Sequence, residues 1–501
     1  MDTNYFFNVL DYGAAGDGLT LDTRAFQAAI RACRQVGGGT VYVPAGRYVI
    51  GSIFLDSHVT LYLEAGATIL GSENVQDYPV VEGRWEGTDR ETYAPLIAGS
   101  DLVNVAVVGR GTIDGRGEGW WKLHREKALA YPRPRLISLT RCVNVLIEGI
   151  TLANSPAWTV NPVNCENVTV DKVTILSPAD SPNTDGINPD SCRNVHISNC
   201  YISVGDDCIA IKSGQEDNGR QNLTPCENIT ITNCTMAAGH GGVVIGSEMS
   251  GGVRNVVISN CVFTQTDRGI RFKSRRGRGG VVEDIRVTNI VMTGVLCPFT
   301  MNLYYACGAW GDEVVSDKRP RPVTEGTPHF RHIHLANITA RGARYAAAFL
   351  YGLPEAPVED VSLSDVSISM SPDAEEGYPE MADDMELMQR AGLFIRNARG
   401  LRLHNVEVTQ QLGPALSVGD STDIDIAACT LQAPPAGAPT IRMSNVDGAF
   451  VHGCKAAPGT GVFLRVEGEN ARQIVLAGND LAQARQPIDV AEDVHPGALV
   501  G

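Results

Sequence analysis

The chain has 501 residues, of which 43% are hydrophobic and 20% are charged, a composition typical of a globular protein rather than a disordered one. The 41 Lys and Arg stand against 57 Asp and Glu, so the net charge is −16. This acidic balance argues against partners such as nucleic acid or an anionic membrane surface. No apolar run reaches the ~20 residues that span a membrane. The length would allow about three domains, but the repeat described below favours a single domain over residues 1–501.

The first residues, Met1–Phe7, lack the basic and apolar regions of a signal peptide, so we expect a cytoplasmic protein. The 13 cysteines are odd in number and form no Cys-x-x-Cys motif, which disfavours a zinc ribbon and a complete disulfide framework within the chain. Many of them occupy one recurrent position in a repeat, where a small buried hydrophobe fits. We therefore expect reduced cysteines, no metal and no cofactor.

One helix is predicted near the start of the chain. Asp22 is its expected N-cap, residues 25–33 carry an apolar stripe at helical spacing, and Gly37–Gly39 ends it. We expect it to cover the open end of the fold, within a cap over about residues 1–40. Two later segments break the pattern and are interpreted as insertions: the loop-like residues 72–93 and the acidic residues 373–386.

Short alternating runs of the Val-x-Ile type recur along the chain. Six copies share a template whose third position is Asn144, Asn167, Asn194, Asn228, Asn255 and Asp284. A single run cannot bury its apolar face, whereas stacked coils line one continuous core. Helical periodicity is nearly absent after residue 35. The sequence therefore predicts an all-β fold, a single-stranded right-handed parallel β-helix of about ten or more coils, with less distinctive coils over about 410–501.

A second strand aligns in four consecutive coils, with one column formed by Ser191, Ser213, Ser247 and Ser274. The alignment places Asp185 and Asp207 at equivalent positions of neighbouring coils, roughly 5 Å apart. Asp206 is beside Asp207, and His240 belongs to the next coil. A lone Asp is usually a turn residue, but stacked carboxylates repel each other and split their pKa values. Three acids in register therefore predict an acid/base site, where one carboxyl donates a proton and another activates water.

A strongly basic run follows in the next coil. It contains six cations and no acid between residues 268 and 278: Arg268, Arg271, Lys273, Arg275, Arg276 and Arg278. The run is either a solvated face that balances the acids or a pocket for an anionic substrate, because guanidinium groups pair well with carboxylates. The glycines at 277, 279 and 280 would let the backbone approach a ligand. The residues alone favour neither interpretation.

Four motifs resemble the signature motifs of glycoside hydrolase family 28, the polygalacturonases: Asn183-Thr184-Asp185, Gly205-Asp206-Asp207, Gly239-His240-Gly241 and Arg271-Phe272-Lys273. They occur in the family's order, and the resemblance covers about residues 7–410. Residues 11–23 are similar to the cap of many pectin-active β-helix enzymes, and Phe272 replaces the Ile of many members. The resemblance implies a pectin lyase-like β-helix and an inverting hydrolase of α-1,4-linked galacturonate, whose partner is an acidic oligosaccharide. Residues 275–280 resemble bacterial exo-acting members.

The resemblance also implies roles. Asp206 corresponds to the general acid, Asp185 and Asp207 to the pair that holds and deprotonates water, and His240 to the residue that tunes the acid. The substrate-binding counterparts are Asn183, Arg271, Lys273 and Tyr304, with Tyr305 as a rival for the last. We expect roughly 6.5–9.5 Å between acid and base, the usual separation in inverting enzymes. A terminal galacturonate is expected to bind Arg275, Arg276 and Arg278.

Other functions remain open. A rhamnogalacturonan α-galacturonohydrolase would use the same catalytic residues, a pectate lyase would bind Ca²⁺ with its acids, and a noncatalytic carbohydrate-binding or spike-like β-helix would need no acids in register. The His240 motif and the Asp206–Asp207 pair favour hydrolysis. We expect release of single residues from chain ends, because insertions 72–93 and 310–328 are long enough to wall off one end of a cleft. The linkage and the oligomeric state stay open.

Overall fold

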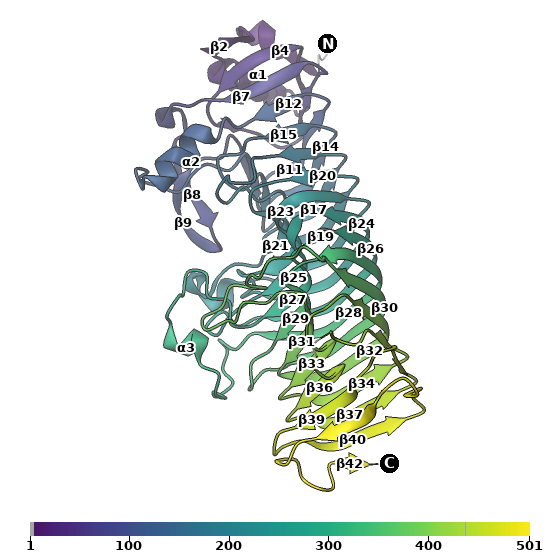
Figure 1. The fold of residues 1–501 in the computed structure, drawn as a ribbon. Helices are drawn as coiled ribbons and strands as arrows, with labels where there is room; N and C mark the ends of the chain where they lie inside the picture. Colours follow the sequence, from purple (N-terminus) through teal and green to yellow (C-terminus); the bar gives the residue numbers. More distant parts are fainter. Residues whose placement is uncertain (1–4, 436, 501) are drawn as a thin grey trace. The chain divides into compact units, whose positions relative to one another are not determined.

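The computed structural model describes residues 5–435 and 437–500. They form two compact units: unit 1 comprises Met1–Val243 with Gly251–Val253, and unit 2 comprises Val244–Ser250 with Arg254–Gly501. Within each unit, parallel strands stack coil upon coil, coloured from purple to teal in unit 1 and from teal to yellow in unit 2 (Figure 1). This arrangement confirms the predicted parallel β-helix. That the whole chain is one domain stays a prediction.

The predicted helix of unit 1 is α1 (Thr23–Gln35), and its buried face includes Phe26, Ile30 and Cys33. The cap differs from the expectation in one respect. The Asp22 side chain does not cap the helix; its carboxylate accepts hydrogen bonds from the backbone N–H groups of Ala15 at 2.7 Å and Gly16 at 3.2 Å. Asp22 is therefore the N-cap residue, as predicted, but its carboxylate binds donors of the preceding turn instead of the first N–H groups of the helix.

The main sheet of unit 1 follows the repeat. Its successive strands pair in parallel, each with the next, in the order β11 (Val103–Gly109), β14 (Val143–Glu148), β17 (Glu166–Asp171), β19 (Arg193–Ser198) and β22 (Cys226–Thr232). Equivalent residues such as Val145, Val168 and Val195 are buried. Stacking these positions builds the core that a single coil lacks.

The recurrent Asn of the template has a structural cause. Asn144, Asn167, Asn194 and Asn228 all have φ between 57° and 60°, a left-handed conformation that Asn tolerates better than most residues. Each donates its side-chain amide to the Asn of the preceding coil at 2.8–3.1 Å, starting from Asn144 and Asn104. One residue type thus supplies both the turn and the ladder between coils.

Two features of unit 1 differ from the sequence interpretation. Residues 72–93 are not a loop, because they contain an antiparallel hairpin of β8 (Val80–Trp85) and β9 (Thr88–Tyr93). A short helix, α2 (Glu118–Arg125), buries Trp120 and Trp121 and was not predicted. Eight residues are too few to display helical periodicity.

Unit 2 continues with the same kind of coil. One of its sheets includes, in order, β25 (Thr266–Lys273), β27 (Cys297–Asn302), β29 (Ala346–Tyr351), β31 (Ala391–Arg396), β33 (Leu416–Gly419), β36 (Ile441–Ser444), β39 (Val462–Glu467) and β41 (Gln486–Val490). Another includes the long strands β26 (Val281–Thr293), β28 (His329–Ala343), β30 (Val358–Met370) and β32 (Ala398–Thr409). The less distinctive residues 410–500 therefore form coils too. Residues 310–328 carry only the short α3 (Glu313–Ser316).

The cysteines are core residues, as the sequence predicts. Twelve of the 13 are buried and Cys307 is exposed. Along one column of cysteines, each thiol accepts a hydrogen bond from the backbone of the preceding coil. The N–H of Cys142 donates to Sγ of Cys165 at 3.3 Å, and the N–H of Cys165 donates to Sγ of Cys192 at 3.4 Å. Across residues 5–435 and 437–500, no helix is long and apolar enough to cross a membrane.

Candidate active site

The register of unit 1 brings two acids together. Ile187 pairs with Ile209 and Asp190 with Lys212, in parallel, so Asp185 and Asp207 occupy equivalent positions of adjacent coils. The backbone N–H of Gly186 donates to the carbonyl of Asp207 at 3.0 Å, which fixes this alignment. The predicted column of acids is therefore confirmed.

The three carboxylates form a compact triad. Asp185, Asp206 and Asp207 each offer an oxygen, and these oxygens all lie within 4.8 Å of one another. The 4.8 Å limit joins one oxygen of each carboxylate, whereas the expected separation of roughly 6.5–9.5 Å refers to whole carboxyl groups, so that expectation stays a prediction. One water that donates to two of these oxygens at about 2.7–2.8 Å spans the gap between them. The triad thus has room for a single water between two of its acids.

Asp185 is a deeply buried member of the triad. It is 3% exposed, and burial, followed by the charges of Asp206 and Asp207, raises its pKa well above the ordinary value. Lys212 and a 2.7 Å hydrogen bond from the Asn188 amide oppose this rise in pKa. Asp185 is therefore protonated at pH values where an exposed Asp is ionised.

Asp206 has a different environment. Its side chain is 22% exposed, and its Oδ1 accepts the backbone N–H of Asp207 at 2.9 Å. The same Oδ1 lies 3.5 Å from Nδ1 of His240, whose backbone N–H also donates to the carbonyl of Asp206 at 2.9 Å. The half-exposed His240 thus accompanies the one acid of the triad that solvent reaches most easily.

Asn183 borders the triad and is held by a residue that the sequence analysis missed. Its φ is 53°, and its Oδ1 accepts a 2.6 Å hydrogen bond from Arg133. Arg133 is 1% exposed and also donates to the carbonyls of Pro156 and Pro182. Burial lowers the pKa of Arg133 to about 10, and the charges of Asp185 and Asp206 counteract this effect. Arg133 lies outside the repeats. The only indication of it in the sequence was that the clustered acids of the predicted site would need a cation nearby.

The hairpin of residues 80–93 covers the coil before the triad. Arg84 reaches Asp190 at 3.1 Å, and Trp85 stacks on Trp158 with ring centroids 6.1 Å apart. Thr159, next to Trp158, donates to the backbone carbonyl of Asp185 at 2.8 Å, so this stack lies one coil from the triad. The hairpin is thereby fixed against the face that carries the acids.

Two further cations lie in this aromatic layer. The Arg135 guanidinium is 5.5 Å from the Trp85 ring and 5.0 Å from the Trp158 ring, and Lys212 Nζ is 4.8 Å from Trp158. The sequence signal for Lys212 was present, since the coil alignment places it in the column of Lys273. Arg135 had no such signal.

In unit 2, the predicted carboxylate-binding residues surround one aromatic ring. Arg271 lies 5.7 Å and Lys273 5.2 Å from the centroid of the Tyr305 ring. Arg271 is also held by Glu380, with Nε to Oε1 at 2.7 Å and Nη2 to Oε2 at 2.9 Å. The two arginines Arg268 and Arg271 lower the pKa of the buried Glu380 to about 2. Glu380 lies within the acidic insertion of residues 373–386 and was not among the predicted site residues.

The other predicted substrate contacts in unit 2 have structural partners. Arg276 is 6% exposed and binds Glu355 with Nε to Oε1 at 2.6 Å, and it also donates to the carbonyls of Val314 and Asp317. Arg275 donates to the carbonyl of Cys307 at 2.6 Å. Arg278 is 3% exposed. These contacts order the loops of unit 2, and Nε, Nη1 and Nη2 of Arg276 all donate to acceptors within the protein.

Tyr304 is buried rather than presented to a substrate. It is 1% exposed, and Lys318 Nζ lies 3.8 Å from the centroid of its ring. Its ring also contacts Tyr351, with centroids 4.6 Å apart. A sugar cannot reach this ring past Lys318. Tyr305 is also largely buried, at 6% exposed, but it lies beside Arg271 and Lys273, so of the two candidates it fits an aromatic substrate contact better.

Comparisons with known proteins identify the family of this chain. Residues 33–379 match the family described as glycosyl hydrolases family 28. The chain belongs to this family. A probable polygalacturonase of Vitis vinifera is 38% identical over 389 residues, covering 76% of this chain and 77% of the relative. The endo-polygalacturonase of Pectobacterium carotovorum subsp. carotovorum is 33% identical over 304 residues, covering 56% and 72%.

A solved structure extends the comparison. The exopolygalacturonase from Thermotoga maritima is 31% identical, with a TM-score of 0.69 over 81% of this chain and 92% of that one. The family 28 chain described here is thus a glycoside hydrolase, and relatives named for internal and for terminal cleavage are both similar to it.

The triad of this family 28 hydrolase also has the composition of a cation site. Carboxylate oxygens suit Ca²⁺, but Ca²⁺ takes six to eight oxygen ligands. The triad supplies three carboxylates, and the raised pKa of Asp185 favours its protonated form, which is a poor cation ligand. The donor set fits acid/base chemistry better than a dedicated Ca²⁺ site.

Proposed function

We propose that the protein hydrolyses the α-1,4 bonds of galacturonate chains with inversion at the anomeric carbon. The observation that carries this proposal is the triad, in which oxygens of Asp185, Asp206 and Asp207 lie within 4.8 Å of one another while their environments differ. Two buried acids and one accessible acid beside a His provide the proton donor and the proton acceptor that glycoside hydrolysis needs.

Each acid has a role in this scheme. Asp206 donates its proton to the glycosidic oxygen as the bond from that oxygen to the anomeric carbon breaks. A water held between Asp185 and Asp207 attacks the carbon from the opposite face and gives its proton to Asp207. Asp185 stays neutral and orients the water, which its raised pKa supports. Asp206 then regains a proton and Asp207 loses one to solvent, which restores the site.

The carboxylates of the substrate require cations. We assign this role to Lys273 and Arg271 around the Tyr305 ring, where Glu380 holds the guanidinium of Arg271 in a fixed orientation. Asn183, fixed by Arg133, is assigned to a sugar hydroxyl near the triad. Arg276 is assigned a structural role, given its ion pair with Glu355.

We also propose that cleavage starts from chain ends. The hairpin fixed by Arg84 and Trp85 covers the coil next to the triad and supports a cleft that is closed on this side. Its tip is held by the segment 215–218, since Asn218 donates to the carbonyl of Gly87 at 2.6 Å and accepts from the N–H of Asp89 at 2.8 Å. A rigid wall of this kind favours a terminal residue over the middle of a chain.

The test uses polygalacturonate and rhamnogalacturonan oligosaccharides in parallel. We expect monomeric galacturonate as the main early product of polygalacturonate, with a slow fall in viscosity relative to the new reducing ends. Rapid viscosity loss with mixed mid-sized products would show internal cleavage. Faster hydrolysis of rhamnogalacturonan than of polygalacturonate would show that the enzyme cleaves the rhamnogalacturonan linkage instead of the proposed one. The cytoplasmic location stays a prediction, which fractionation of the native host tests.

A further inference from the structure

A cavity of about 310 Å³ opens on unit 2, on the sheet that carries Arg271 and Lys273. The register of this sheet stacks one residue per coil in the column of Arg271, in the order Arg271, Thr300, Phe349, Phe394, Ser417 and Arg442. The last three of these residues line the cavity. Phe394 is three coils from Arg271, about 14 Å at 4.8 Å per coil. The cavity is thus outside the group formed by Arg271, Lys273 and Tyr305, but on the same face of unit 2.

The cavity is a slot between an aromatic ring and a guanidinium. Phe394 stacks on Phe349 with centroids 5.4 Å apart and an interplanar angle of 6°, so one face of its ring is covered and the other points to the next coil. There the column holds only Ser417, and Arg442 follows one coil later. Two coil spacings separate Phe394 from Arg442, about 9.6 Å. Contact distances of about 3.5–4.0 Å on each side leave room for one sugar ring.

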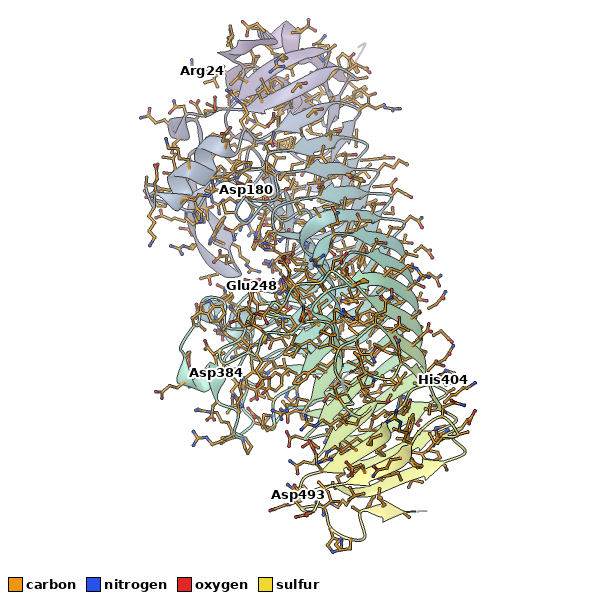
Figure 2. The ribbon with its side chains drawn as sticks, viewed as in Figure 1. Arg24, Asp180, Glu248, Asp384, His404 and Asp493 are labelled. Carbon is orange, nitrogen blue, oxygen red and sulfur yellow. The ribbon has the colours of Figure 1, made fainter. Side chains whose placement is uncertain are left out.

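The charged residues of the slot include two arginines that each lie close to an acid. Arg442 binds Glu467 at 2.6 Å, and Arg396 lies 3.6 Å from Asp420. The loop that borders the slot carries acids, among them Asp384, which is labelled in Figure 2. The ionisable residues that line the slot are Lys318, Arg396 and Arg442 against Asp383, Asp384, Glu386 and Glu467. An ionised galacturonate in the slot would therefore be near more acidic than basic groups. A substrate carboxylate binds well where a guanidinium is available to pair with it.

The loop with these acids is held in place. Asp383 accepts the backbone N–H of Gly311 at 3.1 Å, and the amide of Gln389 donates to the carbonyl of Ala374 at 2.8 Å. Met385 and Met388 of the same loop pack against the cluster that contains Phe349. The slot is therefore bounded by apolar groups and hydroxyls as well as by paired charges, which suits the apolar face and the hydroxyls of a neutral sugar.

We propose that this slot is a second carbohydrate-binding site, which takes an uncharged pyranose unit of the substrate chain, namely a methyl-esterified galacturonate. The identity of the chain rests on the proposed function. The sugar ring stacks on Phe394, with Ser417 beneath it and Arg442 above it. The enzyme would thereby hold partly esterified chains by a neutral unit, while the unesterified units remain for the reaction site.

Calorimetric titration tests the proposal, with a fully methyl-esterified galacturonate oligomer and the unesterified oligomer of the same length as probes. The protein is the Asp206→Asn form, which does not consume the ligand. Phe394→Ala removes the stacking ring, and Ser417→Trp fills the slot without removing a core residue. Phe450→Ala, at a 42% exposed aromatic on another sheet of unit 2, is the matched control.

We expect the esterified oligomer to bind more tightly than the unesterified one. Phe394→Ala and Ser417→Trp should each weaken it about tenfold, while Phe450→Ala leaves the affinity unchanged. Tighter binding of the unesterified oligomer, or unchanged affinity in the folded Ser417→Trp protein, would overturn the proposal. Hydrolysis of trigalacturonate by the wild-type enzyme tests the proposed function separately. A protein that binds the esterified oligomer but cleaves no galacturonide would refute that function and leave the slot standing.

Discussion

Two fully buried carboxylates, Asp185 in unit 1 and Glu380 in unit 2, have opposite pKa shifts. Both lose solvation, which by itself raises a carboxyl pKa. Asp185 has Asp206 and Asp207 as neighbours, and its pKa rises well above the ordinary value. Glu380 has Arg271 and Arg268, and its pKa falls to about 2. Burial is common to both groups, so the neighbouring charges decide whether a buried acid is a reactive group or a fixed counterion.

The same contrast holds between the two charged clusters. Like charges gather in both units, through the register of adjacent coils for Asp185 and Asp207, and within one run of the chain for the cations between residues 268 and 278. In unit 2, Glu380 and Glu355 arrive from other segments and form ion pairs with Arg271 and Arg276. In unit 1, the three acids face one another within 4.8 Å. The raised pKa of Asp185 favours its neutral form, whereas the arginines are fixed in ion pairs.

The largest expected effect concerns the accessible acid. Asp206→Asn removes the proton donor of the triad with an isosteric side chain. We expect turnover of polygalacturonate to fall by at least about 10²–10⁴-fold, the usual contribution of general acid catalysis. Release of reducing ends measures the loss, and an unchanged circular dichroism spectrum is the control for the fold. Near-normal turnover would remove the assignment of Asp206.

Two matched substitutions in unit 2 distinguish an acid that orients a substrate-binding arginine from an acid that only stabilises the fold. Glu380→Gln and Glu355→Gln each break a buried ion pair, so each should lower the free energy of unfolding by about 3–5 kcal/mol. Only Glu380→Gln should also raise the KM for galacturonate oligomers, roughly tenfold or more, because Arg271 then loses its orientation. Denaturant unfolding and steady-state kinetics give the two readouts. An equal rise in KM for both variants would show that Arg276 binds substrate after all.

The pH dependence of stability tests the environment of Asp185. Its raised pKa means that the native state keeps a proton which the unfolded chain has released above its ordinary pKa of 3.8. The free energy of unfolding therefore falls as the pH rises from 3.8 through the raised pKa. Asp185→Asn removes this decline and should stabilise the protein at neutral pH, by about 1.4 kcal/mol per unit of pKa shift. It should also be inactive. Parallel pH profiles of melting temperature in both proteins would contradict the shift.

The smallest expected effect is that of a chelator. Hydrolysis by the triad needs no Ca²⁺ in our scheme, so EDTA followed by dialysis should leave the turnover of polygalacturonate unchanged. Added Ca²⁺ should not increase it. Loss of activity with EDTA and recovery with Ca²⁺ would mean that Asp206 and Asp207 act as ligands, as in a lyase.

Sequence reasoning succeeded where register repeats a residue. The Asn ladder from Asn104 to Asn228 and the stacking of Asp185 on Asp207 are both visible as columns in the aligned coils. It failed where a contact joins segments with no common period. Arg271 and Glu380 are 109 residues apart, and nothing in the acidic insertion distinguishes Glu380 from its neighbours.

The central claim is that the triad hydrolyses an α-galacturonide with inversion, and proton NMR of polygalacturonate during the first turnovers tests it most directly. Our account predicts saturated galacturonate whose β-anomer appears first, before mutarotation produces the α-anomer. An α-anomer that appears first would mean retention, with one acid acting as a nucleophile rather than holding a water. The signal of an unsaturated sugar would mean elimination, and either result would contradict the mechanism.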